Sequence, residues 1–422
     1  MTLDAQLLGS ASFVPGTWKN WYENLSCFAY IVDAHCEDDV IAAVRFAAQK
    51  GLKVRVAGTG HSNVALVPNA GMVIITDNLK GLVSHDKEHQ TATLWGGTKI
   101  HDMGDMLWDV GLGLSNQGDI DSQSIAGAIS TGTHGTGLSL TNLSSRIVSM
   151  RIVDARGEVI VIDGSDERRL RAARVSLGLL GVITQVTMKV SKAYSLHEWI
   201  GIMPYEKVVA LEQAMHEKYR HFTYFWCALP SCVQWLGVDI STRAPEAFTN
   251  CCYVRIFDPD PIDVGELETF TWRRRHDRSY RIYAEVYTKD FDEMEYMIPL
   301  EHAQACFREI ITDQHEHFSK YRFPVEMRVT AGDDNYLSEY QGQARAAISL
   351  AGRMHKNDVD FFRACDRIFA KYQGRSHWAK VNFLDQNRLR EVYPRFQDFV
   401  DVRREMDPEG RFLNEYLAPK FE

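Results

Sequence analysis

Two loops rich in glycine and hydroxyl side chains constrain this chain more than any other feature of its sequence. The first loop, Val56–Ser62 (VAGTGHS), directly follows the apolar run Leu52–Val56, and the second, Ser130–Gly137 (STGTHGTG), lies further along the chain. A turn without bulky side chains lets backbone N–H groups approach a phosphate closely, and in the first loop it also lets His61 project into the adjoining space. The two loops together predict a bound cofactor that contains a pyrophosphate.

Each loop alone is weaker evidence, because an isolated glycine-rich loop is often a plain turn. The first loop is not a dinucleotide fingerprint, since Asn63 stands where a third glycine is needed. A single histidine such as His61 is usually a satisfied surface or core residue. His85, His89 and His101 have no matching set of acidic or cysteine ligands nearby, so we expect no metal site.

Length and charge limit the classes of protein to which the chain can belong. At 422 residues it exceeds the size at which a single core stops growing, roughly 250–300 residues, so we expect two domains. Its net charge of -9 and its pI near 5.9 argue against a nucleic-acid surface. The partners expected on this basis are small molecules.

The cysteines and the N-terminal segment indicate the compartment. The eight cysteines include no CxxC pair of the zinc type, which is typical of a reducing cytoplasm. Met1–Pro15 has no basic segment followed by an apolar run, and no stretch of about 18 or more apolar residues occurs in the chain. The sequence therefore predicts a cytoplasmic protein without a membrane span.

The first part of the chain, up to about residue 190, alternates helices with short strands. Asp38–Gly51 has a capping candidate, apolar residues at helical spacing and a terminal glycine, and it leads into the apolar run that ends at Val56. A second helix is expected at Ile100–Val110, and Leu177–Thr187 runs into a strand. The other expected strands are Met72–Thr76, Thr91–Trp95, Ile147–Val153 and Val159–Ile162.

A change towards aromatic residues and alternating strands marks a second domain, residues 191–373. We expect helices at Tyr205–Tyr219 and Leu300–His315, and strands at Phe222–Cys227, Val233–Val238 and Arg281–Tyr287. Arg273–His276 is interpreted as a solvated charged face. The tail, residues 374–422, is expected to return to the first domain.

Further motifs follow the two loops in a particular order and span nearly the whole chain. They are Gly96–Gly97, Ser115–Gly118 (SNQG), Gln123–Gly127 (QSIAG), Glu293–Tyr296 (EMEY), Glu326–Arg328 (EMR), His377–Lys380 (HWAK) and Asp407–Phe412 (DPEGRF). With the loops, they resemble the vanillyl-alcohol-oxidase type of FAD-linked oxidase, and within it the group of sugar-lactone oxidases and alditol oxidases.

The resemblance implies an α+β protein of two domains with the fold of that type. The FAD-binding domain, residues 1–190, is completed by the tail, residues 374–422, and the inserted antiparallel sheet, residues 191–373, forms the substrate domain. His61 is expected to bond covalently to the 8α-methyl group of the flavin, which raises the redox potential of the cofactor. The residues implied to bind the FAD are Val56, Gly58, Thr59, Gly60, His61, Ser62, Gly118, Asp119, Ser124, Gly127, Thr131, Gly132, Thr133, His134 and Ile183.

Three residues are implied to act on the substrate. Glu326 and Arg328 alternate on an expected strand and so leave the same face, where they can accept from and donate to a substrate hydroxyl. Arg328 should also lower the cost of a charge on Glu326, although without the resemblance an ordinary ion pair is the simpler interpretation. Lys380 matches a lysine that stabilises the reduced flavin, and its alternative is a solvated side chain. For His377, a role in packing and a contact with the substrate are equally possible interpretations.

Three positions bear on the substrate and on the electron acceptor. Ile348 and Leu350 align with a histidine and a threonine that hold the polyol in alditol oxidases, and they cannot make those hydrogen bonds, which disfavours a linear polyol. Asp119 replaces a serine beside the flavin. Gly118 leaves open space beside the flavin, which favours access of dioxygen.

These residues predict oxidation of a hydroxyl of an aldono-1,4-lactone by covalent FAD, with dioxygen as acceptor and H2O2 as product. The alternatives are a dehydrogenase of the same fold with another acceptor, an alditol oxidase, and an oxidase of a hydroxylated substrate that is not a sugar. A flavin-binding protein without turnover is a further alternative.

Overall fold

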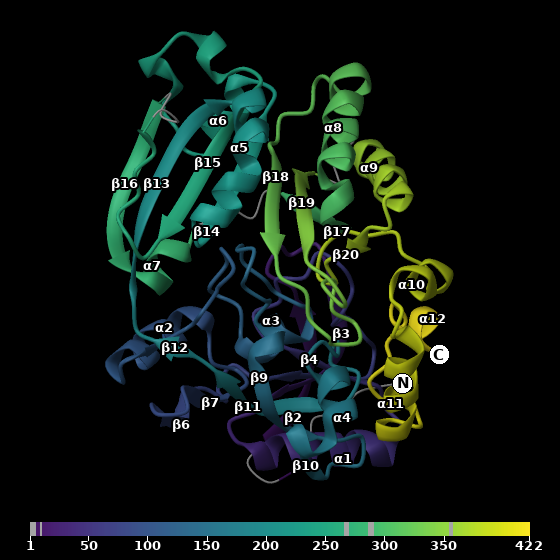
Figure 1. The fold of residues 1–422 in the computed structure, drawn as a ribbon. Helices are drawn as coiled ribbons and strands as arrows, with labels where there is room; N and C mark the ends of the chain where they lie inside the picture. Colours follow the sequence, from purple (N-terminus) through teal and green to yellow (C-terminus); the bar gives the residue numbers. More distant parts are fainter. Residues whose placement is uncertain (1–5, 9–10, 266–269, 286–290, 354–357) are drawn as a thin grey trace.

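The computed structural model describes residues 6–8, 11–265, 270–285, 291–353 and 358–422, and Figure 1 shows their arrangement. The lower half holds two five-stranded sheets. The first sheet has the order β1-β2-β3-β5-β4, antiparallel from β1 to β3 and parallel from β3 to β4. Its strands are β1 (Gln6–Leu8), β2 (Ala11–Lys19), β3 (Ser26–Asp33), β4 (Val54–Ala57) and β5 (Met72–Ile75).

Helix α1 (Glu37–Lys50) connects β3 to β4 and shows why this part of the chain was predictable. Three acidic residues lie in its first turn, where they oppose the positive end of the helix dipole. Gly51 follows in the left-handed conformation, with φ 65°, and ends the helix. The predicted helix and the strand after it are confirmed within one or two residues.

The second five-stranded sheet is antiparallel and has the order β10-β9-β11-β7-β6. Its strands are β6 (Leu82–Asp86), β7 (Thr91–Trp95), β9 (Ile147–Val153), β10 (Val159–Asp163) and β11 (Val182–Lys189). The predicted strands of this region are confirmed. The remaining elements are α2 (Ile100–Asp109), α3 (Ile125–Ser130), α4 (Glu167–Ala173), the pair β8 (Leu112–Gly113) and β12 (Ser191–Lys192), and 3-10 turns at Ser144–Arg146 and Gly164–Asp166.

The upper half of Figure 1 is built on an eight-stranded antiparallel sheet of order β16-β13-β15-β14-β18-β19-β17-β20. Helices α5, α8 and α9 pack on this sheet. The strands are β13 (Ser195–Pro204), β14 (His221–Cys227), β15 (Cys251–Asp258), β16 (Phe270–Arg278), β17 (Asp292–Pro299), β18 (Val325–Thr330), β19 (Arg345–Gly352) and β20 (Arg375–Ser376). The helices are α5 (Tyr205–Lys218), α6 (Pro230–Trp235), α7 (Ser279–Tyr283), α8 (Leu300–His317) and α9 (Val359–Lys371), with 3-10 turns at Ile240–Thr242 and Pro245–Phe248.

The two faces of this sheet differ sharply in polarity. Successive side chains of a strand point to opposite faces, so residues paired across strands share a face. Ser349 of β19 pairs with Glu326 of β18 on one side and with Glu295 of β17 on the other, which places three polar residues in one row. The next positions along, such as Ile348 and Met294, are fully buried in the apolar core. One face is therefore apolar, and the other carries charge.

The C-terminal segment packs beside the first half of the chain (Figure 1). It contains α10 (Gln386–Val392), α11 (Phe396–Met406) and α12 (Ala418–Phe421). The backbone N–H of Val54 donates to the carbonyl of Arg411, and the buried Arg55 donates to the carbonyl of Phe412. These bonds attach the tail to the strand that precedes the first glycine-rich loop.

Two strand predictions in the upper half are wrong. Val233–Val238 is not a strand, because Pro230 starts helix α6, which packs the apolar residues of this stretch against the sheet. The first part of the predicted strand Arg281–Tyr287 forms the end of helix α7 instead. The last two residues of the predicted strand lie outside the described part of the chain.

Arg273–His276 is also only partly a solvated face. Arg273 and Arg275 lie on β16 and both form ion pairs with the carboxylate of Glu198, which is fully buried. None of the helices in the described residues is long and apolar enough to span a membrane.

We expect the Arg411→Ala substitution to destabilise the fold. Arg411 is buried, and its guanidinium donates to the carbonyls of Ala155, Ala47 and Leu52. Loss of these bonds should lower the free energy of unfolding by about 2–4 kcal/mol, measured by urea denaturation. The matched control is Arg404→Ala, at an exposed arginine of the same segment. This substitution should change the free energy of unfolding by less than about 0.5 kcal/mol. Equal stabilities of the two variants would contradict this role.

Candidate active site

A cavity of about 850 Å3 lies beside the first glycine-rich loop, and we term it the loop cavity. Its walls are mostly backbone, glycine and hydroxyl groups. The lining residues are Arg55, Val56, Gly58, Thr59, Gly60, His61, Ser62, Leu66, Val67, Thr76, Gln123, Ser124, Ala126, Gly127, Ser130, Thr131, Leu177, Gly178, Gly181, Ile183 and Ala379.

The glycines of the first loop allow two close approaches. At Gly58, a Cβ atom would lie 2.1 Å from the Oγ of Ser124, so only glycine fits there. Gly60 has φ 75°, and its carbonyl accepts from the backbone N–H of Trp21 at 2.9 Å. The loop is thereby pressed between the turn after β2 and the start of α3.

His61 is held from two sides at the wall of the loop cavity. Its Nε2 lies 2.8 Å from the hydroxyl oxygen of Ser122, and the indole of Trp21 stacks on its ring with centroids 4.6 Å apart. The hydroxyl of Thr59 donates to the carbonyl of Ser122 at 2.6 Å and accepts from Lys99. These contacts fix the orientation of the imidazole.

A second cavity, of about 730 Å3, lies against the charged face of the eight-stranded sheet, and we term it the sheet cavity. Gln123 lines both cavities, so they adjoin. The other lining residues are Gly118, Asp119, Ile120, Thr133, His134, Phe225, Trp235, Phe291, Glu293, Glu295, Pro324, Glu326, Arg328, Ser349, Ala351, His377 and Lys380.

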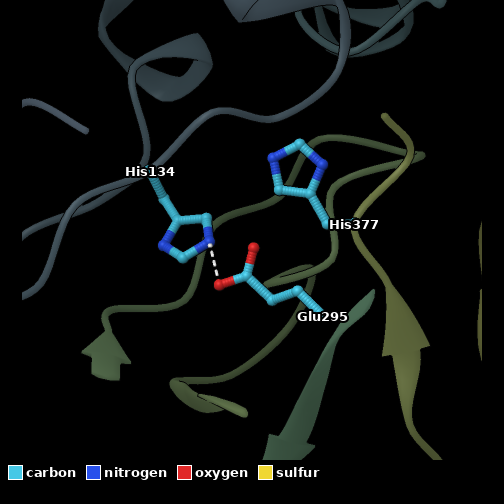
Figure 2. A group of neighbouring side chains, drawn as sticks. All are labelled: His134, Glu295 and His377. Atoms are coloured by element: carbon cyan, nitrogen blue, oxygen red, sulfur yellow. Dashed lines mark ion pairs between the residues drawn. The ribbon is translucent and has the colours of Figure 1, made fainter. Parts of the chain in front are cut away.

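Glu295 is the centre of the charged cluster in the sheet cavity. Its Oε1 accepts from the guanidinium of Arg328 at 2.5 Å and lies 3.4 Å from Nε2 of His134, and His377 lies on its other side (Figure 2). The other ring nitrogen of His134, Nδ1, lies 2.9 Å from the carbonyl of Gly135. Both nitrogens of this imidazole therefore face oxygen atoms.

The charges of this cluster shift the pKa values of Glu295 and Glu326 in opposite directions. Burial alone would raise the pKa of Glu295, but Arg328 and His134 outweigh it and hold this pKa well below its usual range. For Glu326, burial together with the nearby carboxylates of Asp119 and Glu295 outweighs Arg328 and raises the pKa to about 8. Arg328, 3.4 Å from Glu326, thus neutralises Glu295 and leaves Glu326 protonated near neutral pH.

Lys380 and His377 complete the polar part of the cavity. Lys380 is partly buried, which by itself would lower its pKa, but its ion pair with Glu293 raises the lysine pKa. Burial lowers the pKa of His377 to about 3, so this ring is neutral, and its Nδ1 accepts from the backbone N–H of Ala379 at 3.1 Å. The segment Ser376–Val381 continues along β17, where His377 and Val381 donate to its carbonyls.

Two histidines and a carboxylate with ligand atoms within 4.8 Å of one another resemble a metal site in composition. In this cluster, however, the oxygen of Glu295 that faces His134 already accepts from Arg328. A divalent cation there would lie beside a guanidinium, so we interpret the cluster as an ion-pair network.

The residues predicted from the sequence divide between the two cavities. Glu326, Arg328 and Lys380 all line the sheet cavity. Of the predicted cofactor residues, the loop cavity contains Val56, Gly58, Thr59, Gly60, His61, Ser62, Ser124, Gly127, Thr131 and Ile183, and the sheet cavity contains Gly118, Asp119, Thr133 and His134. Gly132 lines neither cavity, and its Cα faces the buried carboxyl group of Glu339 instead.

The two apolar residues expected to disfavour a linear polyol do not line the sheet cavity. Ile348 and Leu350 point into the apolar core, and the residues of β19 that face the cavity are Ser349 and Ala351. Ser349 donates a hydrogen bond to Glu293 at 2.6 Å, so a hydroxyl group is present at this wall.

Sequence reasoning missed Glu295 and the partners of Asp119. Asp119 lies 3.2 Å from Arg255 of β15, and its carbonyl accepts from the backbone N–H of Glu285. These residues are far from one another in the sequence, and only the assembled sheet brings them to one cavity. The single local signal for Glu295 was its place in the EMEY motif.

Comparison with known proteins identifies the family. Residues 264–419 match the family described as D-arabinono-1,4-lactone oxidase, and residues 28–163 match the family described as FAD binding domain. The L-gulono-1,4-lactone dehydrogenase of Mycobacterium tuberculosis is 32% identical over 419 residues, which cover 94% of this chain and 97% of that protein. This chain belongs to the FAD-linked sugar-lactone oxidase and dehydrogenase family.

More distant members and a solved structure agree with this assignment. The L-gulonolactone oxidase of Mus musculus is 27% identical over 436 residues, covering 96% of this chain and 98% of that protein. The alditol oxidase of a Streptomyces species is 24% identical over 434 residues, covering 94% and 97%. Cholesterol oxidase from B. sterolicum superposes with a TM-score of 0.82 at 13% identity, covering 99% and 98% of the two chains. The predicted fold of the vanillyl-alcohol-oxidase type is confirmed, and the chain is an FAD-dependent oxidoreductase that acts on CH–OH groups.

The residues of the loop cavity fit FAD. Close backbone approach at Gly58 and the hydroxyls of Thr59, Ser62 and Thr131 suit a pyrophosphate, because small residues leave room beside the main chain. The loop cavity adjoins the sheet cavity at Gln123, so a long cofactor can reach from one to the other.

The Glu326→Gln substitution should remove one part of the pH dependence of stability. Glu326 has a pKa of about 8 in the folded protein and an ordinary, lower pKa when unfolded. Unfolding therefore releases a proton between these values, and the stability that this residue contributes at low pH is lost as the pH rises to about 8. The free energy of unfolding should fall between pH 5 and pH 8 by about 3–5 kcal/mol more in the wild type than in the variant, measured by urea denaturation. Equal changes in the two proteins would contradict the buried, protonated state.

Proposed function

We propose that this protein oxidises a hydroxyl group of a sugar-derived aldono-1,4-lactone, with FAD attached to His61 and with dioxygen as the electron acceptor. The observation that carries this proposal is the meeting of Glu326, Arg328 and Lys380 in a cavity that adjoins the loop cavity. The substrate class follows the relatives, since three of them are named as oxidases or dehydrogenases of L-gulono- or D-arabinono-1,4-lactone. The overall reaction converts the alcohol and O2 to the ketone and H2O2.

We further propose that one part of the chain binds the cofactor and another part binds the substrate. Residues 1–190 with 374–422 hold the FAD, and residues 191–373 supply the substrate domain. The sheet composition supports this division, because the strands up to Lys189 lie in the lower two sheets, apart from the short β8 that pairs with β12, and strands β13 to β19 form one sheet. β20, at Arg375–Ser376, extends that sheet slightly beyond the proposed boundary.

The side chains of the sheet cavity can hold and deprotonate the substrate hydroxyl. FAD, when bound, supplies the acceptor of the hydride from the carbon. The ionised fraction of Glu326 takes the hydroxyl proton, and its pKa of about 8 suits this role because a general base works best when its pKa lies near the working pH. Arg328 is fixed by Glu295 and donates to the substrate oxygen, and Lys380 adds positive charge on the side of the first loop.

The contacts of His61 support covalent attachment through its Nδ1. Because Nε2 of His61 lies 2.8 Å from the Ser122 hydroxyl, the neutral ring can donate from Nε2 and keep its lone pair on Nδ1. Trp21 stacks on the same ring and limits its rotation. A neutral, oriented imidazole is the form that can attack the flavin methyl group.

Substitution of His61 or Ser122 should change the covalent content of flavin. His61→Ala should contain no flavin that remains with the polypeptide after acid precipitation. Ser122→Ala should incorporate covalent flavin about fivefold more slowly when apoprotein is mixed with FAD, the effect of about one hydrogen bond. The readout is fluorescence of the denatured band on a gel, and Ser84→Ala, an exposed serine, is the control. Wild-type protein whose flavin is fully released by acid would contradict the attachment.

The second candidate is a dehydrogenase that passes electrons to another acceptor. Its supporting observation is the name of the M. tuberculosis relative, a dehydrogenase, at 32% identity. In favour of dioxygen, Gly118 lines the sheet cavity without a side chain. A Cβ atom at this position would lie 3.1 Å from the carbonyl oxygen of His134, so even alanine would crowd this part of the wall.

Separate measurement of the two half-reactions tests the proposal. Under anaerobic conditions an aldono-1,4-lactone should bleach the flavin, and Glu326→Gln should slow this by about 100-fold or more while FAD remains bound. Air should then restore the colour rapidly in the wild type and several-fold more slowly in Gly118→Ala. Gly164→Ala is the control, since a Cβ atom there meets nothing within 4 Å. Slow reoxidation of the wild type would favour the dehydrogenase, and no bleaching by any lactone would refute the proposed substrate.

A further inference from the structure

The sheet cavity has a second, apolar end that the proposed chemistry does not use. Its walls at this end are Ile120, Phe225, Trp235, Phe291, Pro324 and Ala351. Phe225, Phe291 and Ala351 are at most 9% exposed, so a ligand group that reached them would leave water. An aldonolactone alone offers mainly hydroxyl groups, which gain nothing at such a wall.

The strand register places the charged and apolar ends at opposite sides. On β18 the cavity-facing residues run from Arg328 through Glu326 to Pro324, and successive members of such a series are about 7 Å apart. Ala351 on β19 lies one step beyond Ser349 in the same direction. The cavity therefore extends along β18 and β19, from the Arg328–Glu295 ion pair to a wall at which neither strand carries a charged residue.

Aromatic side chains close this end in a fixed arrangement. The ring of Trp235, on the short helix after β14, packs edge to face against Phe291 at 5.6 Å and against Phe323 at 5.5 Å. Phe225, on β14 itself, pairs with Glu326 of β18 and so adjoins the proposed base. Rigid aromatic rings bury a large apolar area at little entropic cost.

We infer that the substrate carries an apolar extension that fills this end: the hydroxyl group to be oxidised lies at Glu326 and Arg328, and an alkyl or aryl group on the same molecule lies against Trp235, Phe291 and Ala351. This inference rests on the proposed function and narrows its substrate class. The charged end orients the molecule and the apolar end adds affinity. Glu293 of β17 pairs with Ala351 in the strand register, but its carboxylate is bound by Lys380 and Ser349, so it presents no unpaired charge to the extension.

A homologous series of lactones tests the inference in the holoenzyme. The probes are 2-hydroxy-1,4-lactones with an unbranched alkyl group of one to five carbons on C4, compared with a polyhydroxylated aldono-1,4-lactone. The second-order rate constant for anaerobic flavin bleaching should rise about fourfold for each added methylene, the effect of burying one such group. In Trp235→Ala this increase should be lost, whereas in Phe28→Ala, with 60% exposed Phe28, it should persist.

A second variant covers the case in which Trp235→Ala does not fold. Ala351→Leu fills the apolar end, so it should slow bleaching by the pentyl lactone at least tenfold more than bleaching by the methyl lactone. Calorimetric binding of the C4-alkyl lactones without the 2-hydroxyl group measures the apolar end independently of turnover, and affinity should again rise with chain length.

The failures of the two proposals are distinguishable. Absence of bleaching by every lactone refutes the proposed function, and the calorimetric series then decides the apolar end alone. Bleaching by the polyhydroxylated lactone, with no gain along the alkyl series, overturns the inference while the proposed function stands. An equal loss for the alkyl and polyhydroxylated lactones in Trp235→Ala would also overturn it, because the ring would then stack on the sugar itself.

Discussion

A fully buried carboxylate, Glu295, determines how the two halves of this protein meet. A buried negative charge is unfavourable unless cations or hydrogen-bond donors lie beside it, and here its partners come from two directions. Arg328 reaches Glu295 from β18, across the intervening strand β19 of the same sheet, and His134 lies beside it on the second glycine-rich loop of the lower half. The charge therefore fixes the position of that loop against the sheet. Arg328 lies closer to Glu295 than to Glu326, which is on the same strand as Arg328 and keeps a raised pKa through burial and the neighbouring carboxylates.

The chemistry of the site thus depends on an unequal sharing of one arginine. If Arg328 paired equally with both carboxylates, Glu326 would be ionised and strongly held, and it would be a weaker proton acceptor. Three further carboxylates, Asp119, Glu293 and Glu295, lie around the same cavity, yet each has its own cationic partner in Arg255, Lys380 or Arg328. Glu326 differs from them because its nearest cation is already bound more closely elsewhere.

Much of the fold follows from local sequence signals, and the site follows from them only in part. Helix α1 was predictable because its acidic first turn and Gly51 are local features, and Glu326 and Arg328 share a face because strands alternate. The stretch Val233–Val238 was wrongly predicted to be a strand, because a short apolar run does not distinguish a strand from a helix that packs on a sheet. The role of Glu295 and the charge state of Glu326 depend on residues of β17 and β18 and of the separate loops that carry Asp119 and His134, which no window of sequence contains.

The segment Ser376–Val381 lies against both cavities at once. The carbonyl of Ala379 accepts from the N–H of Asn63 at the end of the first glycine-rich loop, and Lys380 reaches into the sheet cavity beside Glu293. A ligand that stabilises one side of this segment also restricts the other, and such an effect must be mutual. Binding of the prosthetic group in the loop cavity and binding of the substrate in the sheet cavity are therefore thermodynamically linked. The apoprotein should accordingly be a poor receptor for its own substrate.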